Sequence, residues 1–480
     1  TCGQLEVQAE SNPVRVLARG STEPLLLWGD LYGQSAEVEG TNPAEDGFRY
    51  ARDVAALDFY SHQGNAYCIT ADCWQDLQML AGRYNEPGRF VTLLGYRWAG
   101  NTAGGGARHC IFRTASAPLY RCNTALAGDT EAPYYPLPVL YEALRGREAL
   151  LIAGSGGPAA NLEFHDPQLE RLVQVHTAAG DSSWMLSDAL ARGYQVGVTA
   201  AGNDGQGRPG ASYPGAGDRV SRGGLTCVFA PARTREAIWA GLSARRCYAT
   251  SGERILLEVQ ADGHAMGERY LASRPPRLQV SVSGTDEIEQ VRIYRGQDLV
   301  YTFPEHDPGR PGWLRVRWGG AHARDWPRHL PWDGNLRLER ARIRRVVPYG
   351  FHSPARGIVR SDAEQISFRS STAGNENGLL IDVESEPGAG LEFHVPLTYF
   401  TVPLADLPYE RVLGGDGLFV RVELCPAGSG RRDLDVSWQE AELPAGLTPY
   451  YVVVRQIDGA QAWSSPIFVD GSGQARNLGV

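Results

Sequence analysis

Polar residues that can do chemistry follow several short apolar runs in the first half of the chain. The stretch LLLWGDLYGQS, residues 25–35, is an apolar run that ends abruptly and presents Asp30. Other such runs end at or near His62, His109 and His176. Three imidazoles and a carboxylate are ligands that zinc, manganese or iron accept. Asp30, His62, His109 and His176 are therefore a candidate site for at most one divalent metal ion (Zn, Mn or Fe).

The same positions also favour acid–base chemistry on an anionic substrate. His62 or His176 can act as a general acid or base, with the hydroxyl of Tyr32 beside it. Arginine binds carboxylates and phosphates through a planar, permanently charged group. The candidate catalytic residues are His62, His176 and Tyr32, and the candidate substrate-binding residues are Arg97, Arg208, Gln174 and Asn203.

The elements that must position these residues alternate between strand and helix up to about residue 255. Residues 48–64 predict a helix that leads into a strand ending at His62, and residues 169–180 predict a strand ending near His176. Repeated alternation is typical of parallel strands with helices outside, as in a barrel or a doubly wound sheet. In a parallel barrel the carboxyl ends of the strands meet on one face, which would gather the candidate residues.

The pattern changes after about residue 255. Segments such as RLQVSVSG and PYYVVVRQ are alternating or continuous β runs, separated by Gly, Pro and Asp turns. They predict one or two β-sandwiches. The expected division is an N-terminal strand segment (1–20) that packs on the β-rich region, an α/β barrel (21–255) and a β-rich sandwich region (256–480).

Composition narrows the function classes. The 480 residues carry a net charge of −9, which argues against a general nucleic-acid binder. No apolar run is long enough to predict a membrane-spanning helix, so we expect no membrane as a partner. The chain contains no lysine, so Schiff-base and phosphate-loop lysine chemistry are excluded. The eight cysteines are scattered and fit neither a zinc ribbon nor a dense disulfide framework. We expect mostly free thiols and a cytoplasmic location.

Several longer stretches resemble one family. The chain is similar to the large uncharacterised bacterial branch of the polymerase-and-histidinol-phosphatase (PHP) superfamily. This resemblance implies a distorted (β/α)7 barrel with appended β-structure. Active members are metal-dependent hydrolases, typically phosphoesterases, that bind up to three divalent ions at the carboxyl ends of the strands. The stretches that carry the resemblance are LWGDLYGQS, FRYARDVAALDFYSHQGN, YNEPGRFVTLLGYRWAGN, GRPGASYPGA, GGLTCVFA, REAIWAGLSARRCYATSGERI and TPYYVVVRQIDGAQAWSSPIFV.

The family's metal ligands transfer only in part. Asp30, His62 and His176 match ligand positions, and His109 matches less securely. At least five other ligand positions carry different residues, so the resemblance implies a degenerate site without a full trinuclear cluster. These positions are Tyr32 in place of His, Arg97 in place of a bridging Glu, Gly154 in place of His, and Asn203 and Gly205 in the last motif.

The change at Arg97 has a direct physical consequence. A guanidinium about 4 Å from a divalent ion repels it by several kcal/mol at an effective dielectric constant of about 20. We expect Asp30 to form an ion pair with Arg97 instead, and Tyr32 to fill the space of the missing imidazole.

Three functions remain open from the sequence. The first is a pseudoenzyme that serves as a structural or regulatory subunit, as a homo-oligomer or beside an active paralogue. The second is a hydrolase or lyase with rebuilt chemistry on a small anionic substrate. The third is a binding module in which the pocket or the β-sandwich holds a ligand such as a carbohydrate without turnover. For the β-sandwich, Trp313, Trp318 and Trp326 are candidate exposed aromatic residues.

Overall fold

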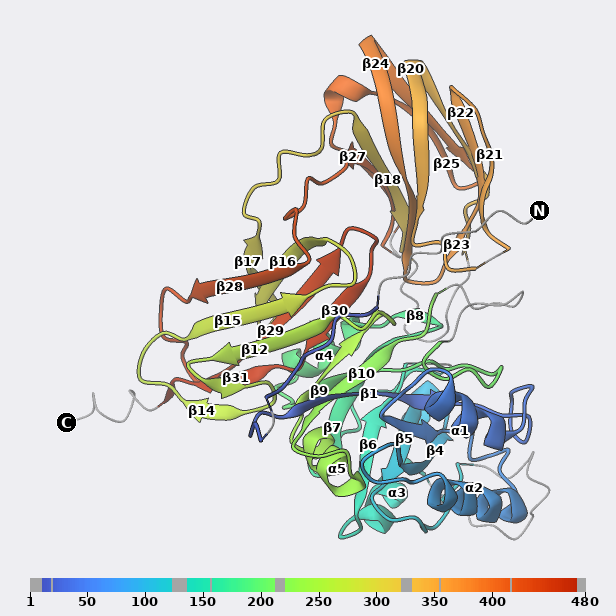
Figure 1. Cartoon of the computed structure of the whole chain (residues 1–480), viewed down its shortest axis with the longest axis vertical. Helices are drawn as coiled ribbons and strands as arrows, with labels where there is room; N and C mark the ends of the chain where they lie inside the picture. Colours follow the sequence, from blue (N-terminus) through green and yellow to red (C-terminus); the bar gives the residue numbers. More distant parts are fainter. Residues whose placement is uncertain are drawn as a thin grey trace.

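The protein is a strand-rich mixed α/β molecule. The computed structural model describes residues 11–18, 20–122, 136–155, 158–211, 221–320, 330–353, 355–414 and 417–472. Figure 1 shows three parts: an α/β part in blue to green, a β-sandwich beside it, and a further β part in orange. Strands greatly outnumber the five α-helices found in these ranges. The mixed α/β class and the change to β-structure in the second half are confirmed.

One large sheet runs through both the α/β part and the β-sandwich. Its strands are β1 (Leu25–Gly33), β2 (Phe59–His62), β3 (Val91–Thr92), β10 (Leu225–Ala230), β11 (Cys247–Thr250), β14 (Arg269–Leu271), β16 (Ile288–Arg295), β17 (Asp298–Phe303), β29 (Leu447–Gln456), β30 (Gln461–Ser464) and β31 (Ile467–Asp470). β1 lies between β2, to which it is parallel, and β10, to which it is antiparallel. β11 pairs with β30, so the sheet contains strands from both sides of residue 255. The domain boundary there stays a prediction.

A second sheet faces the first in the α/β part. Its strands are β4 (Leu94–Ala99), β5 (Ala107–Phe112), β6 (Ala149–Ala153), β7 (Glu170–Thr177), β8 (Gly180–Asp181) and β9 (Gly197–Ala200). β7 is parallel to β6 and β9, but β5 is antiparallel to both β4 and β6. The strands therefore form two sheets rather than one parallel series, and the seven-stranded barrel stays a prediction.

Apolar side chains fill the space between these two sheets. Strands of both sheets contribute to one buried cluster, for example Leu27 and Phe59 from the first and Ile111 and Ile152 from the second. Helices α1 (Ala44–Asp53), α2 (Ala71–Arg83), α3 (Leu137–Leu144), α4 (Trp184–Ala191) and α5 (Arg235–Ser243) pack their apolar sides against the strands. This packing holds the loops at the strand ends in place.

The β-sandwich pairs the large sheet with a smaller one. The smaller sheet contains β12 (Leu256–Ala261), β13 (His264–Ala265), β15 (Arg277–Ser283) and β28 (Asp433–Gln439). The alternating sequence RLQVSVS of β15 buries Leu278, Val280 and Val282 and exposes the residues between them. These side chains belong to the same core cluster as Val291 and Val452 of the large sheet. The period-2 pattern is thus the reason for the sandwich.

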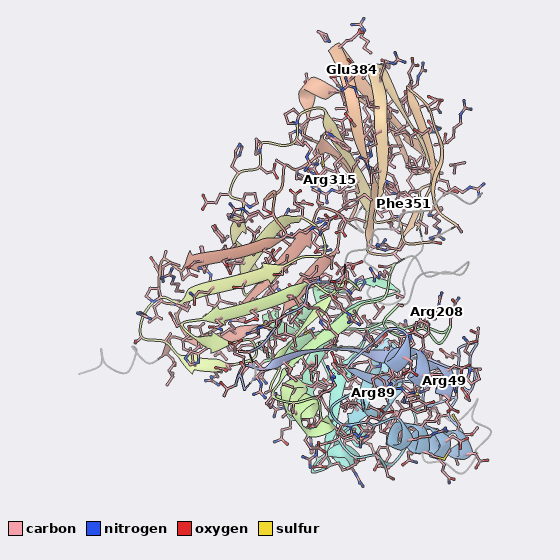
Figure 2. The ribbon with its side chains drawn as sticks, in the orientation of Figure 1. Arg49, Arg89, Arg208, Arg315, Phe351 and Glu384 are labelled. Atoms are coloured by element: carbon pink, nitrogen blue, oxygen red, sulfur yellow. The ribbon has the colours of Figure 1, made fainter. Side chains whose placement is uncertain are left out.

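The third part is an insert between β17 and β28. Figure 2 labels Glu384 at its far end and Arg315 and Phe351 nearer to the rest of the protein. Trp318 was predicted to be an exposed binding residue, but it is buried in the core of the insert and stacks on Phe368. Trp326 lies outside the described residues. The strands of the insert are β18 (Trp313–Gly319), β19 (Leu330–Pro331), β20 (Gly334–Tyr349), β21 (Gly357–Ser361), β22 (Gln365–Arg369), β23 (Ser371–Thr372), β24 (Glu376–Val395), β25 (Thr398–Pro403), β26 (Tyr409–Leu413) and β27 (Leu418–Leu424).

Buried ion pairs join the insert to the sandwich. Arg315 of β18 donates to Glu289 of β16 at 2.6 Å, and both side chains are almost completely buried. Arg455 of β29 forms a second pair across the same boundary, with Glu376 of β24 at 2.5 Å. The pKa of Glu376 lies well below its usual value, because Arg455 and Arg317 outweigh the opposing effect of burial.

The N-terminal segment and the cysteines complete the fold. Residues 11–18 form no strand, although Arg15 pairs with Glu258 of β12 in the sandwich at 2.5 Å; residues 1–10 lie outside the described part. The seven described cysteines are free thiols. No described helix is long and apolar enough to cross a membrane.

Candidate functional site

The strand-end cluster begins at Asp30, which is fully buried at the end of β1. Its Oδ1 accepts hydrogen bonds from the backbone N–H groups of Tyr32 at 3.0 Å and Gly202 at 2.8 Å, and its Oδ2 accepts one from Gly210 at 2.9 Å. Burial raises the pKa of Asp30 to about 6, against the lowering effect of these three donors. The carboxylate thus connects β1 to the loop that follows β9.

The predicted ion pair between Asp30 and Arg97 is wrong. Arg97 instead donates from Nη1 to the Oδ1 of Asn65 at 2.7 Å, and its guanidinium lies 5.9 Å from the ring centre of Tyr32. The backbone N–H groups around Asp30 already supply the positive partial charges that the carboxylate requires. Among the described residues, no ion pair joins the two side chains.

Tyr32 occupies the centre of this cluster. Its ring meets the imidazole of His109 edge to face with 4.4 Å between the ring centres, and its hydroxyl accepts from Gln34 at 3.4 Å. His109 is completely buried, and neither ring nitrogen makes a hydrogen bond of normal geometry within the described part of the chain. Burial and the nearby Arg97 lower the pKa of His109 to about 3. The imidazole is therefore neutral at physiological pH.

Gly154 and Gln174 complete the wall around His109. A side chain at Gly154 would place its Cβ 3.1 Å from the Nε2 of His109, so the glycine makes room for the imidazole. Gln174 accepts from the backbone N–H and the hydroxyl of Ser155 at 3.3 Å, which orders the loop after β6. The structure therefore brings Gln174 to the cluster, where its carbonyl oxygen is engaged by the protein.

His62 lies at the end of β2 but binds protein groups of its own. Its Nε2 is 2.9 Å from the hydroxyl of Ser35, and its Nδ1 accepts from the backbone N–H of Gly64 at 3.3 Å. Burial lowers the pKa of His62 to about 4, although the nearby Glu37 opposes this shift. Both carboxylate oxygens of Glu37 accept from one N–H group, that of Ala44 at the start of α1.

The remaining predicted residues lie in the loop after β9. Asn203 is buried and has a left-handed φ of 49°. The next residue, Asp204, accepts from the backbone N–H groups of Gln206 at 3.2 Å and Arg208 at 2.6 Å. The side chain of Arg208 bonds to Gln206, and Figure 2 places it at the edge of the α/β part. Arg208 is thus away from the buried cluster.

The side chains at the strand ends do not fit a metal ion. Asp30 accepts three backbone N–H groups, and both nitrogens of His62 face protein groups. In the ranges that the structure describes, no three His, Cys, Asp or Glu side chains are arranged to hold a metal. The single-metal site at Asp30, His62, His109 and His176 stays a prediction that this geometry does not favour.

His176 belongs to a different place, the wall of a separate cavity. Its Nε2 donates to the backbone carbonyl of Arg222 at 2.9 Å, and the N–H of Arg222 donates to the Nδ1 of His352 at 3.2 Å. Burial and the charge of Arg222 lower the pKa of His352 to about 4. Both histidines line a cavity of about 540 Å³ where the three parts of the protein meet.

His352 was not among the predicted site residues. It follows the end of the long strand β20, which is the same signal that singled out His62 and His176. Only the α/β half predicted strand ends that meet on one face, because a sandwich strand gives no reason to expect its end there. Ser35 and Asn65, the partners of His62 and Arg97, carried no recognisable signal.

Comparisons with known proteins relate the chain to families without an assigned activity. The model of a protein family of unknown function, DUF3604, matches residues 39–133 and 201–275. An uncharacterised protein of Chlamydia pneumoniae is 27% identical over 324 residues, which cover 61% of this chain and 51% of that protein. One from Chlamydia trachomatis is 26% identical over 325 residues with the same coverage. The chain thus spans about half the length of these relatives.

One solved structure is similar at a low level. It is a two-domain protein from Bacteroides vulgatus that contains a predicted PHP-like metal-dependent phosphoesterase. The likeness has a TM-score of 0.33 and 11% identity, and it covers 82% of this chain and all of that one. The comparisons show similarity to uncharacterised bacterial proteins, and the site itself must carry the functional argument.

Proposed function

We propose that the chain is a PHP-like protein with a distorted (β/α)7 barrel whose metal site has been replaced by hydrogen bonds within the protein. It acts as a pseudoenzyme, a structural or regulatory subunit that assembles with copies of itself or with an active relative. The observation that carries this proposal is that both oxygens of Asp30 are held by backbone N–H groups, three in all. Both oxygens of this carboxylate already accept a hydrogen bond from the backbone, and Oδ2 keeps one acceptor position for a metal ion.

Two further contacts support this proposal. The guanidinium of Arg97 lies over Tyr32 and opposes any cation placed beside it. The Nε2 of His62 and the hydroxyl of Ser35 share a hydrogen bond, whereas a metal ligand would need that nitrogen free. Tyr32 and Arg97, two of the replaced ligand positions, each contact a protein partner, as expected for a remodelled site rather than for one in which ligands were simply lost.

The first test is the metal content of protein purified without chelators or immobilised metal. We expect far less than one equivalent of zinc, manganese and iron by mass spectrometry, because no described group of ligands is arranged to bind them. His62→Ala should leave the content unchanged. The matched control is His264→Ala, which removes a surface histidine that faces Glu268.

The outcome that would contradict the proposal is equally specific. It is about one equivalent of metal that is lost in His62→Ala or His176→Ala but kept in His264→Ala. Hydrolysis of p-nitrophenyl phosphate in the presence of Mn²⁺, abolished by the same two substitutions, would contradict the pseudoenzyme hypothesis and support the hypothesis of a rebuilt hydrolase.

A further inference from the structure

The cavity beside His176 is built from all three parts of the protein. Its volume is about 540 Å³, a size typical of sites for small molecules. Trp184 of α4 lines it from the α/β part, and Tyr451 and Trp463 line it from the sandwich. Tyr349 and Phe419 line it from the insert. The cavity is therefore separate from the strand-end cluster around Asp30, and an inference from it does not depend on the proposed function.

One cation in this wall lacks a counter-ion. Arg292 of β16 makes no hydrogen bond or ion pair with any described residue, and its Nε is buried without a partner. The other two arginines of the wall differ, because Arg222 pairs with Glu253 and Arg455 pairs with Glu376. A buried guanidinium N–H that lacks an acceptor is costly, so Arg292 is suited to an acid group supplied from outside.

The same wall contains hydrogen-bond acceptors that are not satisfied. The Nε2 of His176 donates to a carbonyl, so its Nδ1 must be an acceptor, and this atom is buried with no partner. Asp181 accepts one backbone N–H, from Ser183, at Oδ1 and accepts none at Oδ2 within the described chain. Hydroxyl groups are the neutral donors that match such acceptors.

Aromatic rings supply the apolar part of the wall. Tyr294 and Tyr451 are stacked with 4.9 Å between ring centres and 6° between ring planes. Trp463 stacks on His176 at 5.9 Å, which fixes the orientation of the imidazole. Flat aromatic surfaces beside polar groups suit a ligand that has an apolar ring face and a polar edge.

We propose that this cavity binds a small hydroxylated ring compound that carries an acid group, a sugar acid or a sugar phosphate. Its carboxylate or phosphate pairs with Arg292, its hydroxyls donate to the Nδ1 of His176 and the Oδ2 of Asp181, and its ring lies against the aromatic wall.

The test is isothermal titration calorimetry with D-glucuronate and D-glucose 6-phosphate, each compared with D-glucose and inorganic phosphate. We expect a dissociation constant of about 1 mM or tighter for at least one of the two charged sugars. Which of them binds distinguishes the carboxylate from the phosphate. Arg292→Gln should weaken binding at least about tenfold, because a charge-assisted contact is lost. Arg292→Lys keeps the charge without the planar group, so its affinity should lie between those of the unchanged protein and Arg292→Gln.

The matched control is Arg337→Gln on β20, an exposed strand arginine with no ion pair to any described residue. It should bind as the unchanged protein does, and circular dichroism should show that both glutamine variants remain folded. The proposal is wrong if neither charged sugar binds up to about 10 mM. It is also wrong if inorganic phosphate binds as well as the sugars, or if Arg292→Gln and Arg337→Gln have the same affinity.

Discussion

Arg108→Met should lower the free energy of unfolding by about 3–5 kcal/mol, one of the two largest effects we expect from this structure. Arg108 is completely buried and forms an ion pair with Glu170, which is 2% exposed. Its other nitrogens donate to four backbone carbonyls of nearby loops. Glu170 also accepts from Tyr141 at 2.6 Å. Removal of the cation would leave a buried carboxylate and several carbonyls without their donors, and urea unfolding measures the loss.

Two further variants make this expectation specific. Arg113→Met removes an exposed pair with Glu148 and should cost less than about 1 kcal/mol. The double variant Arg108→Met with Glu170→Met should recover part of the loss, because it leaves no unpaired charge. A cost for Arg108→Met no larger than that of Arg113→Met would mean that the buried pair contributes nothing.

The second large effect is a loss of stability in mild acid. The histidines His62, His109 and His352 have pKa values of about 4, 3 and 4, against an ordinary value near 6.5, chiefly because burial disfavours their charged form. The unfolded chain therefore binds more protons than the folded protein below pH 6.5. Stability falls as the pH drops, by about 1.4 kcal/mol per unit for each histidine until its folded pKa is reached.

Asp30 acts in the opposite direction. Its raised pKa of about 6 means that the folded protein takes up this proton first, which adds stability as the pH falls below 6. The net expectation between pH 7 and pH 5 is a loss of about 4 kcal/mol, measured by urea unfolding at a series of pH values. His109→Leu should reduce the slope without a large cost at pH 7, because neither ring nitrogen of His109 makes a hydrogen bond of normal geometry to a described residue. A free energy of unfolding that does not change over this range would contradict the buried, neutral histidines.

Local patterns predicted the elements well. The strands that carry Asp30, His62 and His176 near their carboxyl ends exist, and the period-2 segments after residue 255 form sheets. Each of these features follows from the order of apolar and polar side chains along its own segment. The antiparallel direction of β5 could not be read in this way. His109 therefore reaches the cluster from within a strand that runs opposite to the expected direction.

The partners of the site residues were less accessible to sequence reasoning. The pairing of Asp30 with Arg97 was inferred from charge alone. Asp30 instead accepts hydrogen bonds from backbone N–H groups, which no residue type in the sequence reveals. His176 and His352 are brought together by Arg222, and their separation in the chain exceeds any local pattern. The cavity they share depends on how an inserted β part sits against the rest.

That insert has a consequence for motion. Its first and last strands, β18 and β27, pair side by side with Leu314 opposite Leu424, so the chain enters and leaves the insert at neighbouring points. The Arg315–Glu289 and Arg455–Glu376 ion pairs join the insert to the sandwich near these points. Because Tyr349 and Phe419 belong to the insert whereas Tyr451 and Trp463 belong to the sandwich, a small rotation of the insert would widen or narrow the cavity. The two ion pairs oppose such a rotation, so the insert couples the strength of these pairs to the width of the cavity.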